Sequence, residues 1–243
     1  MKRKVLVTRS QPGADSLAAA LKEAGYQPRI TSVIRIEATP YLNSLKELEN
    51  YSLFIFISAA AVRLATEIIS YLQGDKNPEI YAIGPETERQ LRLVSLNSNC
   101  PERADSEGLL ALTSLLAIGG KRVLIICGRR GRETLQQQLR DRGAEVDRAE
   151  VYQRLPAPVV LQDMGDLDAV IISSGEGLRC FLNLIRNIPG QVLEQNPGWL
   201  PMLVPSHRVA NQARIAGVKD IIVCEGASSE AVLCKLDVLF SSA

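Results

Sequence analysis

Small, hydroxyl and arginine residues follow several of the short apolar runs in this sequence. They stand at Thr8-Arg9, Ser58, Gly84 with Thr87, Gly128 with Arg132, Ser174 and Ser206. Hydroxyl and guanidinium groups donate hydrogen bonds, and small residues let backbone N–H groups face a ligand, so the set is typical of anion binding. A ligand with many carboxylates would suit such a set.

Each of these residues also has a plainer explanation. Ser and Thr after a strand often cap the next helix, and the arginines of the Gly128–Arg132 loop are of a type that is mostly exposed. The single histidine, His207, is expected to lie on the surface in the first turn of a helix. For each position alone both interpretations stay open, whereas the whole set favours a binding rim.

The signatures of several other sites are missing. The chain has five cysteines without a C-x-x-C pair and one histidine, which argues against structural zinc and predicts mostly small, buried cysteines: Cys100, Cys127, Cys180, Cys224 and Cys234. Neither G-x-S-x-G nor a nucleotide-binding glycine motif occurs. The net charge of +1 argues against a broad nucleic-acid surface. Because no apolar run reaches the roughly 18 residues of a membrane helix and no signal peptide is evident, a cytoplasmic protein is expected.

The apolar runs themselves predict the elements that position these residues. Seven short runs are typical of buried parallel strands: Val5–Thr8, Leu53–Ile57, Tyr81–Ile83, Val123–Cys127, Ala169–Ser173, Met202–Val204 and Ile221–Cys224. Helical spacing lies between them, and Gly25 and Gly143 are expected to end two of the helices. Alternating strands and helices predict an α/β protein with parallel sheets, in which ligands bind beyond the carboxyl ends of the strands.

The sequence also repeats itself. Val5, Leu17 and Gly25 correspond at one constant offset to Val123, Leu135 and Gly143, and a second pair of segments places Ser58 over Ser174. Two long copies predict two similar domains, for which a flavodoxin-like fold fits. The repeat leaves open whether the domains are consecutive or nested. The extended character of Arg29–Thr39 and Glu150–Pro158 favours nesting with two chain crossings.

The order and spacing of these motifs resemble one family over almost the whole chain. VLVTR, FISAAAV, YAIGPETERQL, DSEGLL, VLIICGRRGRETLQQQLRDRGAEVDRAEVYQR, IISSGEGL, SHRVANQARIAGV and EGASSEAVL follow the pattern of uroporphyrinogen-III synthases. The resemblance implies two similar flavodoxin-like α/β domains with parallel sheets, nested and joined by a two-strand hinge. One would comprise residues 1–36 plus 156–243, and the inserted one residues 37–155.

The resemblance implies a substrate and a reaction. The substrate is hydroxymethylbilane, a linear tetrapyrrole with eight carboxylates. It loses water, passes through a spiro intermediate and closes with ring D inverted to uroporphyrinogen III, on the route to heme, siroheme and chlorophyll. The family is similar in being monomeric and free of metal or organic cofactors, and the upstream porphobilinogen deaminase is a candidate partner.

The resemblance also implies the site residues. Tyr152 matches the tyrosine implicated in the loss of water. The alternative interpretation is that Tyr152 is an ordinary aromatic residue of a strand. Substrate binding is implied for Thr8, Arg9, Ser58, Gly84, Thr87, Gly128, Arg132, Ser174, Ser206, Ser228 and Ser229. The chain departs from the family where Ala59–Ala61 replaces a loop that often holds asparagine, and where Ser206–Val209 lacks a threonine used by some members.

Two rival functions stay open at this point. A two-lobed sensor that closes on a small anion would have the same rim without catalysis. A flavodoxin-like electron carrier would share the fold, but the first loop, SQPGADS, lacks the hydroxyl-rich phosphate cradle expected of a flavin site.

Overall fold

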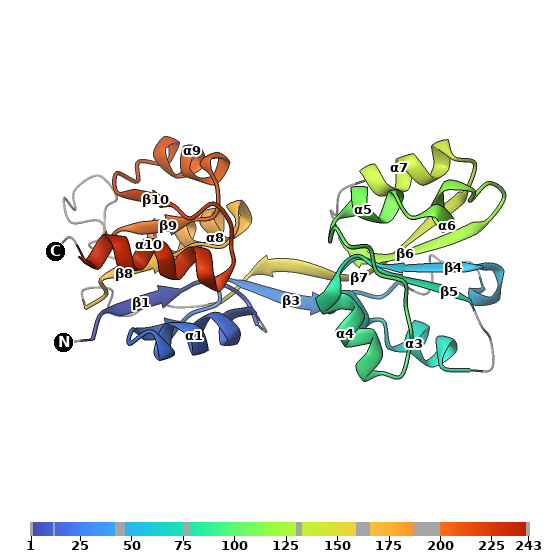
Figure 1. The fold of residues 1–243 in the computed structure, drawn as a ribbon, viewed down its shortest axis with the longest axis horizontal. Helices are drawn as coiled ribbons and strands as arrows, with labels where there is room; N and C mark the ends of the chain where they lie inside the picture. The colour runs from blue at the N-terminus through green and yellow to red at the C-terminus, as the bar shows by residue number, and fades with distance from the viewer. Residues whose placement is uncertain are drawn as a thin grey trace. The chain divides into compact units, whose positions relative to one another are not determined.

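The computed structural model describes residues 2–11, 13–41, 47–74, 78–129, 133–158, 166–186 and 200–241. The chain divides into two compact units, which we call the first unit (residues 1–35 and 155–243) and the second unit (residues 36–154). The blue N-terminal and red C-terminal segments belong to the same unit (Figure 1). The chain passes between the units twice, within two of its strands.

The first unit is built on a five-stranded sheet in the order β10-β9-β8-β1-β2. All four neighbouring pairs are parallel. The strands are β1 (Lys4–Val7), β2 (Gln27–Ile30), β8 (Ala169–Ile171), β9 (Met202–Val204) and β10 (Ile221–Val223). The helices are α1 (Gly13–Glu23), α8 (Gly175–Arg186), α9 (His207–Ile215) and α10 (Ser229–Ser241).

Alternation along β1 explains why helices cover both faces of this sheet. Val5 and Val7 pack with Leu17 of α1 and Leu236 of α10. Leu6 points to the opposite face and joins a second core with residues of α8 and α9. Successive side chains of a strand point to opposite faces, so an apolar strand without polar breaks needs cover on both sides.

The second unit has a five-stranded sheet in the order β3-β7-β6-β4-β5. Its strands are β3 (Ile34–Ala38), β4 (Leu53–Phe56), β5 (Glu79–Ala82), β6 (Arg122–Gly128) and β7 (Glu145–Pro156). The pairs β4–β5, β4–β6 and β6–β7 are parallel. The edge strand β3 runs antiparallel to β7. Two hydrogen bonds show this, since Thr39 N donates to Val151 O and the earlier residue Val33 accepts from the later residue Ala157 N.

Helices again cover both faces of the second sheet. The helices are α2 (Ala59–Leu64), α3 (Thr66–Leu72), α4 (Pro85–Leu93), α5 (Ser106–Leu110), α6 (Thr113–Leu116) and α7 (Thr134–Asp141), with a 3-10 turn, η2, at Leu48–Asn50. Phe54 and Phe56 pack with residues of α2, α3 and α4, whereas Leu53 and Ile55 pack with α5, α6 and α7. Figure 1 shows α5, α6 and α7 on one side of the sheet and α3 and α4 on the other.

The predicted α/β class is confirmed, and both sheets are parallel except for the antiparallel edge strand β3. The seven predicted strands are present with small shifts at their ends, and Gly25 and Gly143 follow α1 and α7 with φ of +89° and +85°. The edge strand β2 was missed, because three of its four residues are exposed and it lacks an apolar run. The second extended segment was placed too short, since β7 begins at Glu145.

No helix in the described part of the chain is long and apolar enough to cross a membrane.

Candidate functional site

A bulge in β7 sets the direction of Tyr152. The parallel register with β6 holds as far as Cys127 and Glu150, but Gly128 then pairs with Tyr152, so Val151 is an extra residue. Arg129 N donates to Tyr152 O at 2.7 Å directly after the bulge. Because a bulge re-aims the side chain beside it, Tyr152 can lie 97% buried at the carboxyl end of the sheet while Val151 stays in the core (exposed fractions 3% and 0%).

The phenol of Tyr152 lies directly against Gly128. A Cβ added to Gly128 would lie 2.5 Å from both Cε2 and Cζ of the Tyr152 ring. Real Cβ atoms do not approach this closely, so the ring position requires glycine here. The predicted residues Gly128 and Tyr152 are therefore in contact in the structure.

The Tyr152 hydroxyl has two polar neighbours among the residues that the structure describes. It lies 3.2 Å from Ser58 Oγ, and Nη2 of Arg154 donates to it at 3.3 Å. Ser58 is also the N-cap of α2, where its Oγ accepts a hydrogen bond from Ala61 N at 3.1 Å. Ser58 therefore caps a helix, as the plainer interpretation expects, and it also contacts Tyr152.

A cavity of about 200 Å³ opens beside Tyr152, between the carboxyl ends of the central strands and helices α5 and α7. Its walls are apolar side chains of the sheet and α7 together with a polar set. Among the described residues, the polar lining consists of Ser106, Arg129, Gln136, Arg148, Tyr152 and Arg154. Three guanidinium groups at one small cavity make it suited to an anion.

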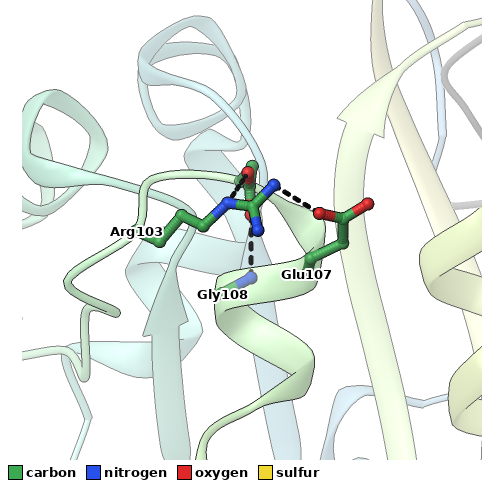
Figure 2. A network of polar contacts seen from close by, with 4 residues as sticks. Arg103, Glu107 and Gly108 are labelled. Carbon is green, nitrogen blue, oxygen red and sulfur yellow. Dashed lines mark hydrogen bonds and ion pairs between the residues drawn. The ribbon is translucent and has the colours of Figure 1, made fainter.

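A capping network fixes the start of α5, where Ser106 lies. Asp105 Oδ1 accepts from Gly108 N at 2.8 Å, and Arg103 Nε donates to Asp105 Oδ2 at 2.6 Å. Arg103 also pairs with Glu107, and Figure 2 shows its guanidinium group held above the first turn of the helix. The Gly108 N–H and the Arg103 guanidinium keep the pKa of Asp105 below its usual value. The charged carboxylate is the form that caps the first turn of α5, where Ser106 lies.

Cys127 lies at the back of the cavity and is fully buried. Burial raises the pKa of its thiol, and the Arg148 guanidinium opposes that rise only in part. Cys127 is therefore a neutral wall residue at neutral pH, as expected of a buried cysteine.

The other predicted residues of the second unit flank this edge of the sheet. Gly84 is the N-cap of α4, and Thr87 is buried in the first turn of the same helix. Arg132 lies outside the described residues. Gly84 and Thr87 do not line the cavity.

The predicted residues of the first unit also follow the carboxyl ends of parallel strands. Thr8 donates its hydroxyl to Ile171 O at 2.8 Å and so ties β1 to β8. Arg9 Nη1 donates to Ala227 O at 3.1 Å. Three serines accept hydrogen bonds as helix caps, namely Ser174 from Gly177 N at 3.0 Å, Ser206 from Val209 N at 3.4 Å and Ser228 from Ala231 N at 3.2 Å. Ser229 is the first residue of α10, and His207, first in α9, is exposed as predicted.

Sequence reasoning missed Arg148, Arg154 and Gln136 as cavity residues. Arg148 pairs in register with Ile125 of the central strand β6. Arginine is mostly exposed, so its place between the buried residues Val146 and Ala149 was the signal available in this segment. The described residues contain no group of three His, Cys, Asp or Glu placed to hold a metal ion.

Comparisons with known proteins agree with one another. A family model described as "Uroporphyrinogen-III synthase HemD" matches residues 15–234. A uroporphyrinogen-III synthase of Salmonella typhimurium is 32% identical over 94% of this chain and 98% of its own length, and that of Escherichia coli is 32% identical over the same shares. The solved uroporphyrinogen-III synthetase of Helicobacter pylori covers 98% of this chain and 100% of its own with a TM-score of 0.64. Its 15% identity supports the fold alone.

Proposed function

The chain belongs to the uroporphyrinogen-III synthase family, and we propose that it carries out the family's reaction beside Tyr152, at the carboxyl end of the second unit's sheet. The chain is accordingly an enzyme, a cyclising lyase of tetrapyrrole biosynthesis. The observation that supports this location is the phenol of Tyr152, which lies between Gly128, Ser58 and the arginine-lined cavity.

The reaction closes hydroxymethylbilane to uroporphyrinogen III with loss of one water. The terminal hydroxyl leaves, the substituted carbon of the last pyrrole attacks the resulting azafulvene, and the spiro intermediate fragments and recloses with ring D inverted. The pyrroles supply the electrons for each step. The protein therefore has two tasks, which are to fold the linear chain so that the disfavoured carbon is near and to protonate the departing hydroxyl.

Tyr152 is suited to the second task. Arg154 donates to the phenol oxygen, so the phenol's own proton is directed away from Arg154, toward Ser58 Oγ or a substrate oxygen. We therefore assign Tyr152 the role of proton donor to the leaving hydroxyl.

The first task falls to the donor-rich residues at the strand ends of both units. We propose that they hold the substrate's carboxylates, many of them through backbone N–H groups, and that they comprise Thr8, Arg9, Ser58, Gly84, Thr87, Gly128, Arg132, Ser174, Ser206, Ser228 and Ser229. A monomeric state, a cytoplasmic location and docking of the upstream deaminase stay predictions.

A coupled isomer assay tests the proposed function. Hydroxymethylbilane is generated in situ by the deaminase, this protein is added, and the oxidised porphyrins are separated by chromatography. We expect predominantly the type III isomer, whereas the deaminase alone yields type I by spontaneous closure. Type I alone in the presence of folded protein and confirmed substrate would refute the function.

A further inference from the structure

Two of the cavity's arginines, Arg129 and Arg148, are only loosely neutralised by the ion pairs they form with described residues. None of the described residues that line the cavity is acidic. Glu150 pairs with two of the arginines, at 3.7 Å from Arg129 Nε and 3.4 Å from Arg148 Nη2. Both distances exceed the roughly 2.7–2.9 Å of a tight charged hydrogen bond. A better placed anion would therefore gain stronger contacts than Glu150 makes.

Of the two arginines that pair with Glu150, Arg148 has the less exposed side chain. It is 13% exposed, against 53% for Arg129. Its Nε is buried and has no hydrogen-bond partner among the described residues, and the Cys127 thiol beside it is a weak acceptor. A buried cationic donor without an acceptor is costly, so this atom marks the point in the cavity where a ligand oxygen would be stabilised most.

The size of the cavity limits what can enter it. Pockets that take whole drug-sized molecules measure about 300–1,000 Å³, whereas this cavity measures about 200 Å³. It has room for a substituent and none for a folded tetrapyrrole. A short acidic side chain satisfies both the volume and the charge.

We propose that this cavity takes one carboxylate side chain of the substrate, with Arg148 as the anchor at its base and Arg129 and Arg154 nearer its mouth. The inference rests on the proposed function, because it identifies the ligand as part of the linear tetrapyrrole. Arg154 also contacts the Tyr152 hydroxyl at 3.3 Å. The pyrrole that carries the anchored acid is therefore held next to the proposed proton donor.

The test compares hydroxymethylbilane with analogues that each have one carboxylate side chain replaced by an uncharged alkyl group. For wild-type protein we expect one analogue to have a KM about 10- to 100-fold higher than the full substrate, the usual worth of a hydrogen bond to a charged group. In Arg148→Gln, the full substrate should show that same higher KM, and the same analogue should cause no further rise. Such coupling isolates the contact between the two groups.

Two further variants keep the test decisive. Arg92→Gln removes one positive charge from the same unit, but Arg92 lies exposed at the end of α4 in an ion pair with Glu88, so its KM should not change. Arg148→Lys retains the charge and loses the planar fork. For the full substrate, Arg148→Lys should raise KM less than Arg148→Gln does. The analogue that raises KM in wild-type protein should raise it less in this variant, so Arg148→Lys replaces the glutamine variant if that one does not fold.

The outcomes separate the two proposals. If every analogue raises KM as much in the Arg148 variants as in wild-type protein, the carboxylates bind elsewhere and the inference is wrong. Failure of the proposed function would be seen earlier, as type I product from wild-type protein and the full substrate.

Discussion

The hydroxyl of Tyr152 is the one atom of this side chain that the proposed chemistry needs, and Tyr152→Phe removes it while keeping the ring. The ring contacts with Gly128 and with the core around β4 persist in the variant, so the fold should be unchanged. General acid catalysis contributes about 100- to 10,000-fold. We therefore expect kcat to fall by about 100-fold or more, measured as the rate of type III formation in single-turnover reactions.

Tyr51→Phe is the matched control for this substitution. Tyr51 is a buried tyrosine of the same unit, and its hydroxyl donates to Asp147 Oδ2 at a distance of 2.9 Å. Tyr51 does not line the cavity. We expect it to keep its rate of ring closure even where it loses some stability. Equal rates for Tyr152→Phe and wild-type protein would remove Tyr152 from the mechanism.

Gly128 controls where the phenol can lie. In Gly128→Ala the new Cβ would lie 2.5 Å from two ring carbons of Tyr152, so the ring must move. Overpacking of this kind costs about 1–3 kcal/mol, and the displaced hydroxyl should lower kcat nearly as far as Tyr152→Phe does. Urea unfolding gives the first quantity, and the single-turnover assay gives the second.

The double variant and a second glycine make this prediction specific. Gly128→Ala combined with Tyr152→Phe should be no slower than the slower single variant, because both act on the same hydroxyl. Gly119→Ala serves as the control, since its Cβ would meet only Arg142 O at an ordinary 3.5 Å. A Gly128→Ala enzyme with wild-type kcat would show that the phenol position does not matter.

At the scale of elements, one hydrogen bond joins the C-terminal helix to the start of the first unit. The Tyr26 hydroxyl donates to Asp237 Oδ1 of α10 at 2.8 Å. Burial, together with this carboxylate, raises the pKa of Tyr26 to about 12. In an unfolded chain the value returns to about 10, so the folded state holds the proton more tightly.

This difference predicts how alkali affects the first unit. The stability linked to Tyr26 is fully present below about pH 10 and is lost as the pH rises through about 12. We expect the denaturant midpoint to fall across that window, and to fall less steeply in Tyr26→Phe, which has no proton to lose. Identical slopes for the variant and wild-type protein would assign the alkaline loss to other groups.

Strands and helix ends were predictable where a local signal exists. The buried runs of β1, β4 and β6 are continuous apolar sequences, and Gly25 ends α1 because few other residues adopt its positive φ. The bulge at Val151 has no such signal, since it depends on how β7 pairs with β6. The contact between Tyr152 and Gly128 was therefore not predicted, although the family resemblance had singled out each residue separately.

At the scale of the whole molecule, the repeat predicted two similar α/β halves, and each half has a five-stranded sheet with at least four parallel strands. The repeat could not decide whether the two domains are consecutive or nested, because the strands are equally apolar in both arrangements. In the structure β1 pairs with β8, across more than half of the chain. The cavity was beyond prediction for a similar reason, since its arginines come from β7 and the end of β6 and meet only through sheet pairing.

The division into two units makes a last prediction about their independence. Both apolar cores of the second unit consist entirely of residues within 36–154, so this segment expressed alone should fold and unfold cooperatively, as followed by circular dichroism. It would retain Tyr152, Gly128 and Arg148, but it would lack the carboxylate-binding residues proposed for the first unit. Because ring inversion requires the whole substrate to be folded, we expect the isolated unit to leave closure to the spontaneous type I route. Type III product from the isolated unit would place all of the necessary substrate contacts within residues 36–154.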